Sequence, residues 1–116
     1  MTRLTQEKQG SGTVTGTVTT NSPITTATPY SVTLTVADTE YSQALPANTR
    51  YFEFQARTAA DVRWAFVTGK VAGPVEPYRT LKSGSNYYSP DVNLTGVTLY
   101  LGSAVALTVV ELLVWS

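Results

Sequence analysis

The carboxylates are the first residues of this chain whose spacing could support chemistry. Asp38 and Glu40 are two positions apart, so they share one face of an extended chain. A glycosidase-like acid pair or a loose calcium site could be built from them. However, the chain lacks a calcium loop of the DxDxDG type, and two carboxylates at this spacing are typical of a solvated strand end. We therefore expect no catalytic residue, no cofactor and no metal site, and the protein is predicted not to be an enzyme.

Histidine and cysteine are absent from all 116 residues. Their absence excludes disulfides, thiol nucleophiles, Ser-His-Asp triads and imidazole metal ligands. Eight Lys and Arg residues balance eight Asp and Glu residues, and charged residues make up only 14% of the chain. Because nucleic-acid binders usually carry a basic surplus, we expect no direct contact with nucleic acid. A net charge near zero instead favours association with another protein.

Outward tyrosines and arginines are the best candidates for a binding surface. Tyr51 and Tyr100 are predicted to point away from the core, which suits a protein interface or a sugar-binding surface. Arg57 and Arg63 flank a short loop and are expected on the same solvent side, facing an acidic partner. Trp115, in contrast, is predicted to be a core residue.

Apolar and polar residues alternate with period two in most of the chain, which predicts strands. The clearest strands are expected over residues 30–37, 50–57, 62–67, 97–101 and 107–115, with short ones at 78–81 and 87–88. Residues 38–48 are expected to be a connection. Two aromatic-rich strands, 50–57 and 62–67, are predicted to pair across a hairpin. The last strand is apolar on both faces, so it either lies in the middle of a sheet or has one face, at Val110 and Leu112, against another subunit.

This pattern predicts an all-β protein: an antiparallel β-sandwich or jelly roll of six to eight short strands with an extended N-terminal arm. Residues 21–116 are expected to form a single domain, and residues 1–20 an arm or edge strand that contains a GTVT repeat. The N-terminus lacks the apolar segment of a secretory signal, and the longest apolar run, residues 105–115, is shorter than the ~20 residues of a membrane helix. The predicted partner interface comprises Thr13, Val14, Thr15, Thr17, Val18, Tyr51, Arg57, Arg63, Tyr100, Val110 and Leu112.

A series of packing and turn residues from Tyr41 onward carries a resemblance. The segments are YSQALPANT (41–49), FEFQAR (52–57), VRWAF (62–66), TGKV (68–71), YRTL (78–81), TLYL (98–101) and VWS (114–116). Their order and spacing resemble a family of small virion structural proteins of tailed bacteriophages. The resemblance covers residues 41–116, and residues 1–40 carry no comparable match.

The resemblance implies a virion protein assembled in the bacterial cytoplasm. The function it implies first is capsid cement or decoration: the protein would self-associate as a dimer or trimer and staple neighbouring major capsid subunits on the outer capsid surface. A neck, tail or fibre-associated adaptor is the alternative, and a small carbohydrate-binding module is a further one. No membrane contact is expected.

Overall fold

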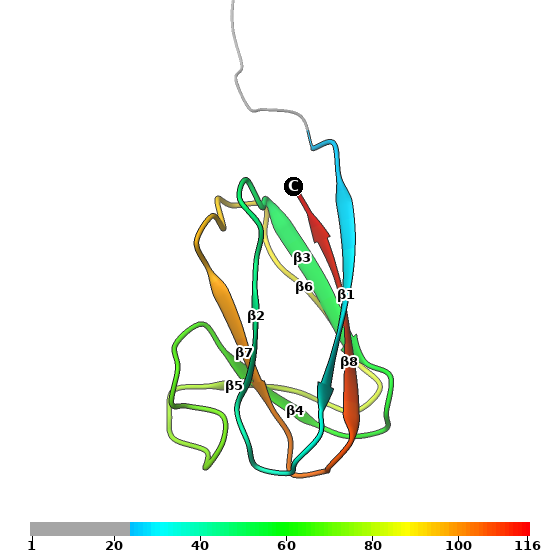
Figure 1. Cartoon of the computed structure of the whole chain (residues 1–116), viewed down its shortest axis with the longest axis vertical. Coiled ribbons are helices and arrows are strands. Elements are labelled where there is room, and N and C mark those ends of the chain that lie inside the picture. The colour runs from blue at the N-terminus through cyan, green and yellow to red at the C-terminus, as the bar shows by residue number, and fades with distance from the viewer. Residues whose placement is uncertain (1–23) are drawn as a thin grey trace, which may run out of the picture.

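A computed structural model describes residues 24–116, which form eight strands and no helix. Figure 1 shows them as two layers packed face to face. The strands are β1 (Ala27–Leu34), β2 (Tyr41–Ala44), β3 (Tyr51–Ala56), β4 (Val62–Ala65), β5 (Arg79–Leu81), β6 (Asn86–Tyr88), β7 (Thr98–Gly102) and β8 (Thr108–Trp115).

The strands form two four-stranded antiparallel sheets, with orders β1-β8-β3-β6 and β2-β7-β4-β5. Apart from the β4–β5 connection, every connection between consecutive strands crosses from one sheet to the other. This strand order is that of a jelly roll, as predicted from the alternation. The two ends of the described chain lie together, since the amides of Thr25 and Thr26 donate to the carbonyl oxygen of Ser116 at 3.0 and 2.9 Å.

The core lies between the sheets and is built from one side of each strand. In β8, Thr108, Val110, Leu112 and Val114 are buried, whereas the intervening residues are half-buried on the opposite side. From the other strands, the fully buried large side chains include Leu34, Phe52, Val62, Leu99 and Leu101. Because β8 pairs with β1 on one side and β3 on the other, it is an interior strand of its sheet.

The predicted pairing of the two aromatic-rich strands is wrong. β3 pairs with β6 and β8, whereas β4 pairs with β5 and β7, so they belong to opposite sheets. Their aromatic residues still meet, but across the core: the rings of Phe54 and Trp64 are edge to face with centroids 5.4 Å apart. The short connection, residues 57–61, suits a hairpin and a crossover equally well, so loop length did not distinguish them.

Several boundaries also differ from the sequence-based expectation. The predicted connection 38–48 contains β2, whose short alternation gave too weak a signal. The first clear strand runs from Ala27 to Leu34 rather than over residues 30–37, and its apolar successor Val36 is 56% exposed. Alternation continued over the expected strand 62–67 would place Phe66 on the core side, but Phe66 is 44% exposed, because β4 ends at Ala65. The predicted arm, residues 1–20, lies outside the described residues.

Candidate functional site

The two sheets differ in what lies over their outer sides. On the outer side of the β2-β7-β4-β5 sheet, Arg63 is covered by the loop of residues 66–78. Its guanidinium donates to the carbonyl oxygens of Val71 at 2.8 Å and Ala72 at 3.1 Å, and to the Asp38 carboxylate at 2.7 Å. Only 14% of the Arg63 side chain is exposed. We call this side of the molecule the loop-covered face.

Two further contacts fasten the loop to this face. Gly102 pairs with Arg63 in the sheet, and a Cβ at Gly102 would come within 2.7 Å of the Val71 carbonyl oxygen. Glycine at 102 therefore permits the loop to lie directly on the strand. The Glu40 carboxylate accepts hydrogen bonds from the Thr68 hydroxyl and the Gly69 amide. Val71 itself is completely buried, so this loop is a packed part of the structure.

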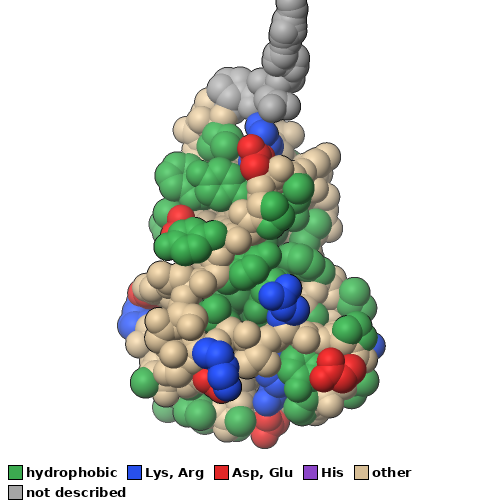
Figure 2. Space-filling view, turned by 180° about the vertical axis from the view of Figure 1, so that it is seen from behind, with side chains coloured by type: hydrophobic (Ala, Val, Ile, Leu, Met, Phe, Trp, Pro, Cys, Tyr) green, Lys and Arg blue, Asp and Glu red, His purple; other side chains and the backbone are tan. Residues whose placement is uncertain are grey.

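The outer side of the β1-β8-β3-β6 sheet has no comparable loop among the described residues. Its side chains form rows set by the strand register, with Trp115 beside Tyr51, Leu113 beside Glu53 and Glu111 beside Gln55. β6 extends two of these rows with Tyr88 and Asn86. We call this surface the open face, defined by Tyr51, Glu53, Gln55, Arg57, Asn86, Tyr88, Val109, Glu111, Leu113 and Trp115. Figure 2 shows the molecule from behind, where hydrophobic side chains lie among both acidic and basic ones.

Glu111 is the best-fixed polar group of the open face. The Gln55 side-chain amide donates to one of its oxygens at 3.0 Å, and the Arg57 guanidinium donates to the other at 2.8 Å. These bonds, first that from Gln55 and then that from Arg57, lower the pKa of Glu111 below its ordinary value. Glu111 is therefore an ionised acceptor held in one orientation.

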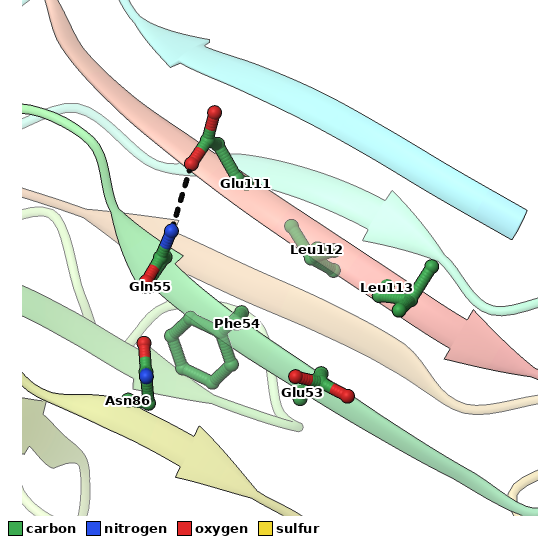
Figure 3. Close-up of a pocket in the computed structure, with 7 residues that line it drawn as sticks. All are labelled: Glu53, Phe54, Gln55, Asn86, Glu111, Leu112 and Leu113. Carbon is green, nitrogen blue, oxygen red and sulfur yellow. Dashed lines mark hydrogen bonds between the residues drawn. The ribbon is translucent and has the colours of Figure 1, made fainter.

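A shallow depression of about 170 Å³ lies beside this pair (Figure 3). Its lining residues are Glu53, Phe54, Gln55, Asn86, Glu111, Leu112 and Leu113. The Glu53 carboxylate and the side-chain amide of Asn86 have no hydrogen-bond partner among residues 24–116. The depression thus combines fixed polar groups with groups available to a ligand.

An aromatic pair stands about four residues, or ~13 Å, along the strands from Glu111. The rings of Tyr51 and Trp115 stack with centroids 5.7 Å apart and an interplanar angle of 23°. Within the described part of the chain, the buried indole Nε1 of Trp115 has no hydrogen-bond partner. Among residues 24–116, the Trp115 ring is therefore held by stacking on Tyr51 and not by a hydrogen bond from its indole. Tyr88, opposite Glu53 in the register, is 62% exposed.

A second surface lies at the end of the molecule away from Ser116, where the β1–β2 and β7–β8 loops meet (Figure 1). The Leu107 amide donates to the Leu34 carbonyl oxygen, and the Asp38 amide donates to that of Ser103, both at 2.8 Å. Between these bonds, Val36, Val105 and Leu107 are 56%, 48% and 63% exposed. We call these three residues the apolar loop end. Leu107 also has a φ of 63°, a left-handed conformation that is unfavourable for a leucine.

The structure separates the predicted interface residues. Tyr51 and Arg57 lie on the open face, whereas Arg63 and Tyr100 belong to the outer side of the other sheet. The prediction that Arg57 and Arg63 share a solvent side is therefore wrong, because their strands are in opposite sheets. The remaining predicted residues Thr13, Val14, Thr15, Thr17 and Val18 lie outside the described residues.

The assignment of Val110 and Leu112 to a partner interface is also wrong. Their exposed fractions are 0% and 3%, and both belong to the core of this domain. Trp115, predicted to be inside, instead lies with Glu111 on the outer side of β8. The position of Glu111 could have predicted this placement. Residues two apart in a strand share a face, so the charged residue marks Leu113 and Trp115 as outward.

The carboxylates Asp38 and Glu40 do not form a joint site. Asp38 pairs with Arg63, while Glu40 binds the start of the 66–78 loop. No group of three or more potential metal-ligating side chains occurs among residues 24–116. Over the same range, no helix is long and apolar enough to cross a membrane.

No family model and no curated protein matches this chain. Among solved structures it is similar to one described as the solution NMR structure of a de novo designed double-stranded β-helix. The two share 16% sequence identity over 79% of this chain and 100% of that chain, with a TM-score of 0.47. The strand order within the two sheets, rather than this likeness, defines the fold.

Proposed function

We propose that this protein is a structural component of a larger assembly, and specifically a capsid decoration protein of a tailed bacteriophage. The sequence resemblance over residues 41–116 supports the virion role. The observation that carries the proposal is the apolar loop end, because it presents to a partner three exposed apolar side chains on two loops. In this role the protein holds neighbouring major capsid subunits together through added contact area.

The apolar loop end differs from scattered surface residues, which are common in soluble proteins. Its three side chains come from two loops joined by backbone hydrogen bonds at both ends. A left-handed leucine costs on the order of 1–2 kcal/mol, and its side chain buries little in the domain itself. Strained residues of this kind cluster where a ligand or partner binds.

Self-association is the second part of the proposal. The described sheet edges are β1, β2, β5 and β6, with eight, four, three and three residues. Of these edges, β1 is the longest and offers the most backbone groups for pairing with a strand of the predicted arm, residues 1–20. A neighbouring copy would add that strand to the β1 edge, which is the usual geometry of strand addition.

The test is binding to expanded, DNA-free phage capsids that lack this protein, followed by cryo-electron microscopy. Extra density repeated over the whole shell is the expected result. A shell without extra density overturns the decoration role. Density restricted to the portal or tail also overturns it, in favour of the adaptor.

Two matched variants test the docking surface. Leu107→Asn removes the apolar side chain and places a residue that tolerates the left-handed conformation, so the domain stays folded. We expect its capsid affinity to fall by about tenfold or more, since one buried large side chain is worth ~1.5–3 kcal/mol. Val75→Ser, at a residue that is 52% exposed on a different loop, is the control and should bind normally. Equal binding of both variants excludes the apolar loop end as the docking surface.

A further inference from the structure

We propose that the open face binds a neutral oligosaccharide, with one sugar ring in the depression beside Glu53 and Asn86. This binding site is separate from the apolar loop end and goes beyond the proposed role in assembly. It rests on three features of the open face: hydrogen-bonding groups available to a ligand, flanking aromatic rings, and the balance of charge.

The hydrogen-bonding groups suit a ring of hydroxyls. A sugar hydroxyl both donates and accepts, and it is matched by planar carboxylate and amide groups. Glu53 and Asn86 supply such groups from neighbouring strands without partners among the described residues. The Gln55 side-chain amide is already bonded to Glu111, which leaves its carbonyl oxygen for a ligand. Figure 3 shows Gln55 and Glu111 directed toward each other across β3 and β8, with Asn86 on one side of the Phe54 ring and Glu53 on the other.

The shape suits a ligand that lies on the surface. At about 170 Å³ the depression is smaller than the ~300–1,000 Å³ of pockets that enclose a drug-sized molecule. It therefore fits one ring of a longer chain. Further rings can extend toward the stacked pair of Tyr51 and Trp115, ~13 Å along the strands.

The aromatic side chains complement the apolar side of a sugar. A pyranose ring presents C–H groups of slight positive charge, which are attracted to the negative face of an aromatic ring. Tyr88 is 62% exposed beside Glu53, so it can contact a ring bound in the depression.

The charges select a neutral ligand. Arg57 is the basic residue of the open face, and its guanidinium is engaged by Glu111 at 2.8 Å. Glu53 has no compensating partner among residues 24–116, so it repels an anionic sugar, a phosphate or a nucleic acid. Glu53 would repel an acidic protein surface in the same way, so the open face does not suit an acidic partner.

The experiment uses the full chain and NMR chemical-shift mapping. The probes are the linear hexasaccharides of glucose (α-1,4, β-1,4 and β-1,3 linked), mannose and N-acetylglucosamine, with sialyllactose as the anionic probe, each at up to ~10 mM to detect weak binding. We expect at least one neutral probe to shift the amides of Glu53, Gln55 and Asn86 and the indole N–H of Trp115. The only other tryptophan, Trp64, is buried in the core. The indole signal that disappears in Trp115→Phe therefore belongs to Trp115.

Variants then locate the site. Glu53→Ala and Asn86→Ala should each weaken binding by about tenfold, as expected for a lost hydrogen bond to a ligand. Glu76→Gln and Thr80→Ala, at exposed residues away from the open face, should bind like the parent chain.

Three outcomes overturn the inference: no shift with any neutral probe, preferential binding of sialyllactose, or shifts confined to residues outside the open face. Concentration-dependent shifts of the open face without sugar, together with a dimer in sedimentation, would also overturn it by assigning the surface to a second copy of the chain. None of these results depends on capsid binding, which uses a different end of the molecule.

Discussion

The outer sides of the two sheets differ in whether a loop covers them. On the loop-covered face, residues 66–78 lie over Arg63 and Gly102 and are held by hydrogen bonds from both sides. On the open face, half-buried aromatic and carboxylate side chains have no such loop over them within residues 24–116. The chain thus uses its own residues to cover one sheet, and it leaves on the other a surface with the chemistry of a binding site.

The comparison also separates two kinds of arginine. Arg63 has 14% of its side chain exposed and binds two backbone carbonyls, so it has a structural role. Arg57 has 60% exposed and pairs with one carboxylate, so it belongs to the solvated surface.

The largest expected effect comes from placing a charge on the core side of β8. Leu112→Lys places a charge in the core, where Leu112 is 3% exposed, and should abolish the cooperative unfolding transition. Leu113→Lys, one residue away on the open face, should remain folded. Circular dichroism with urea unfolding measures both. A folded Leu112→Lys protein would contradict the assignment of the two sides.

Gly102→Ala tests how closely the 66–78 loop lies on its sheet. The added Cβ would meet the Val71 carbonyl oxygen at 2.7 Å, so the loop must move. We expect a loss of about 1–3 kcal/mol in the free energy of unfolding, as for other overpacked sites. Faster hydrogen exchange confined to residues 66–78 would show that the loop is displaced. Gly73→Ala, with open space around its Cβ position, is the matched control.

The paired variants Arg63→Ala and Arg57→Ala compare the two faces directly. Arg63→Ala removes the hydrogen bonds to Val71 and Ala72 and should lower the free energy of unfolding by about 1–2 kcal/mol. Arg57→Ala breaks an exposed ion pair and should cost less than about 1 kcal/mol. Chemical denaturation of both variants measures the difference. Equal losses would mean that the loop contributes nothing to the stability of its face.

The smallest expected effect is the pH dependence of Glu111. Because its pKa in the folded protein lies below the ordinary value of 4.5, the ionised form stabilises the fold. That contribution is complete above the pKa of the unfolded chain and is lost as the pH falls through the lower folded-state pKa. Glu111→Gln should therefore reduce the decline of stability on acidification below about pH 4.5. Urea unfolding between pH 7 and pH 3 measures the effect, with Glu76→Gln as the control. An unchanged acid profile would mean that the hydrogen bonds of Gln55 and Arg57 do not favour the ionised form.

The fold class could be predicted because strand alternation is a local property. The residues of β3 show it well: Phe52 and Phe54 face inward, while Glu53 and Gln55 face outward together with Tyr51, whose direction was predicted. The pairing of β3 with β8, in contrast, joins residues more than fifty positions apart, and no local pattern specifies it. The open face depends on that pairing, since it brings Gln55 to Glu111 and Tyr51 to Trp115.

The sequence by itself determined that the chain forms short strands with one apolar side, and that imidazole and thiol chemistry are excluded. The tertiary structure alone decided which side of β8 is core, which sheet the 66–78 loop covers, and that Glu53 and Asn86 lie at one depression. The physical reason is that alternation fixes the two sides of a strand, whereas the burial of a side depends on the sheet packed against it. For β8 that sheet comprises β2, β7, β4 and β5, and contacts across the core, such as that of Phe54 with Trp64, set the result.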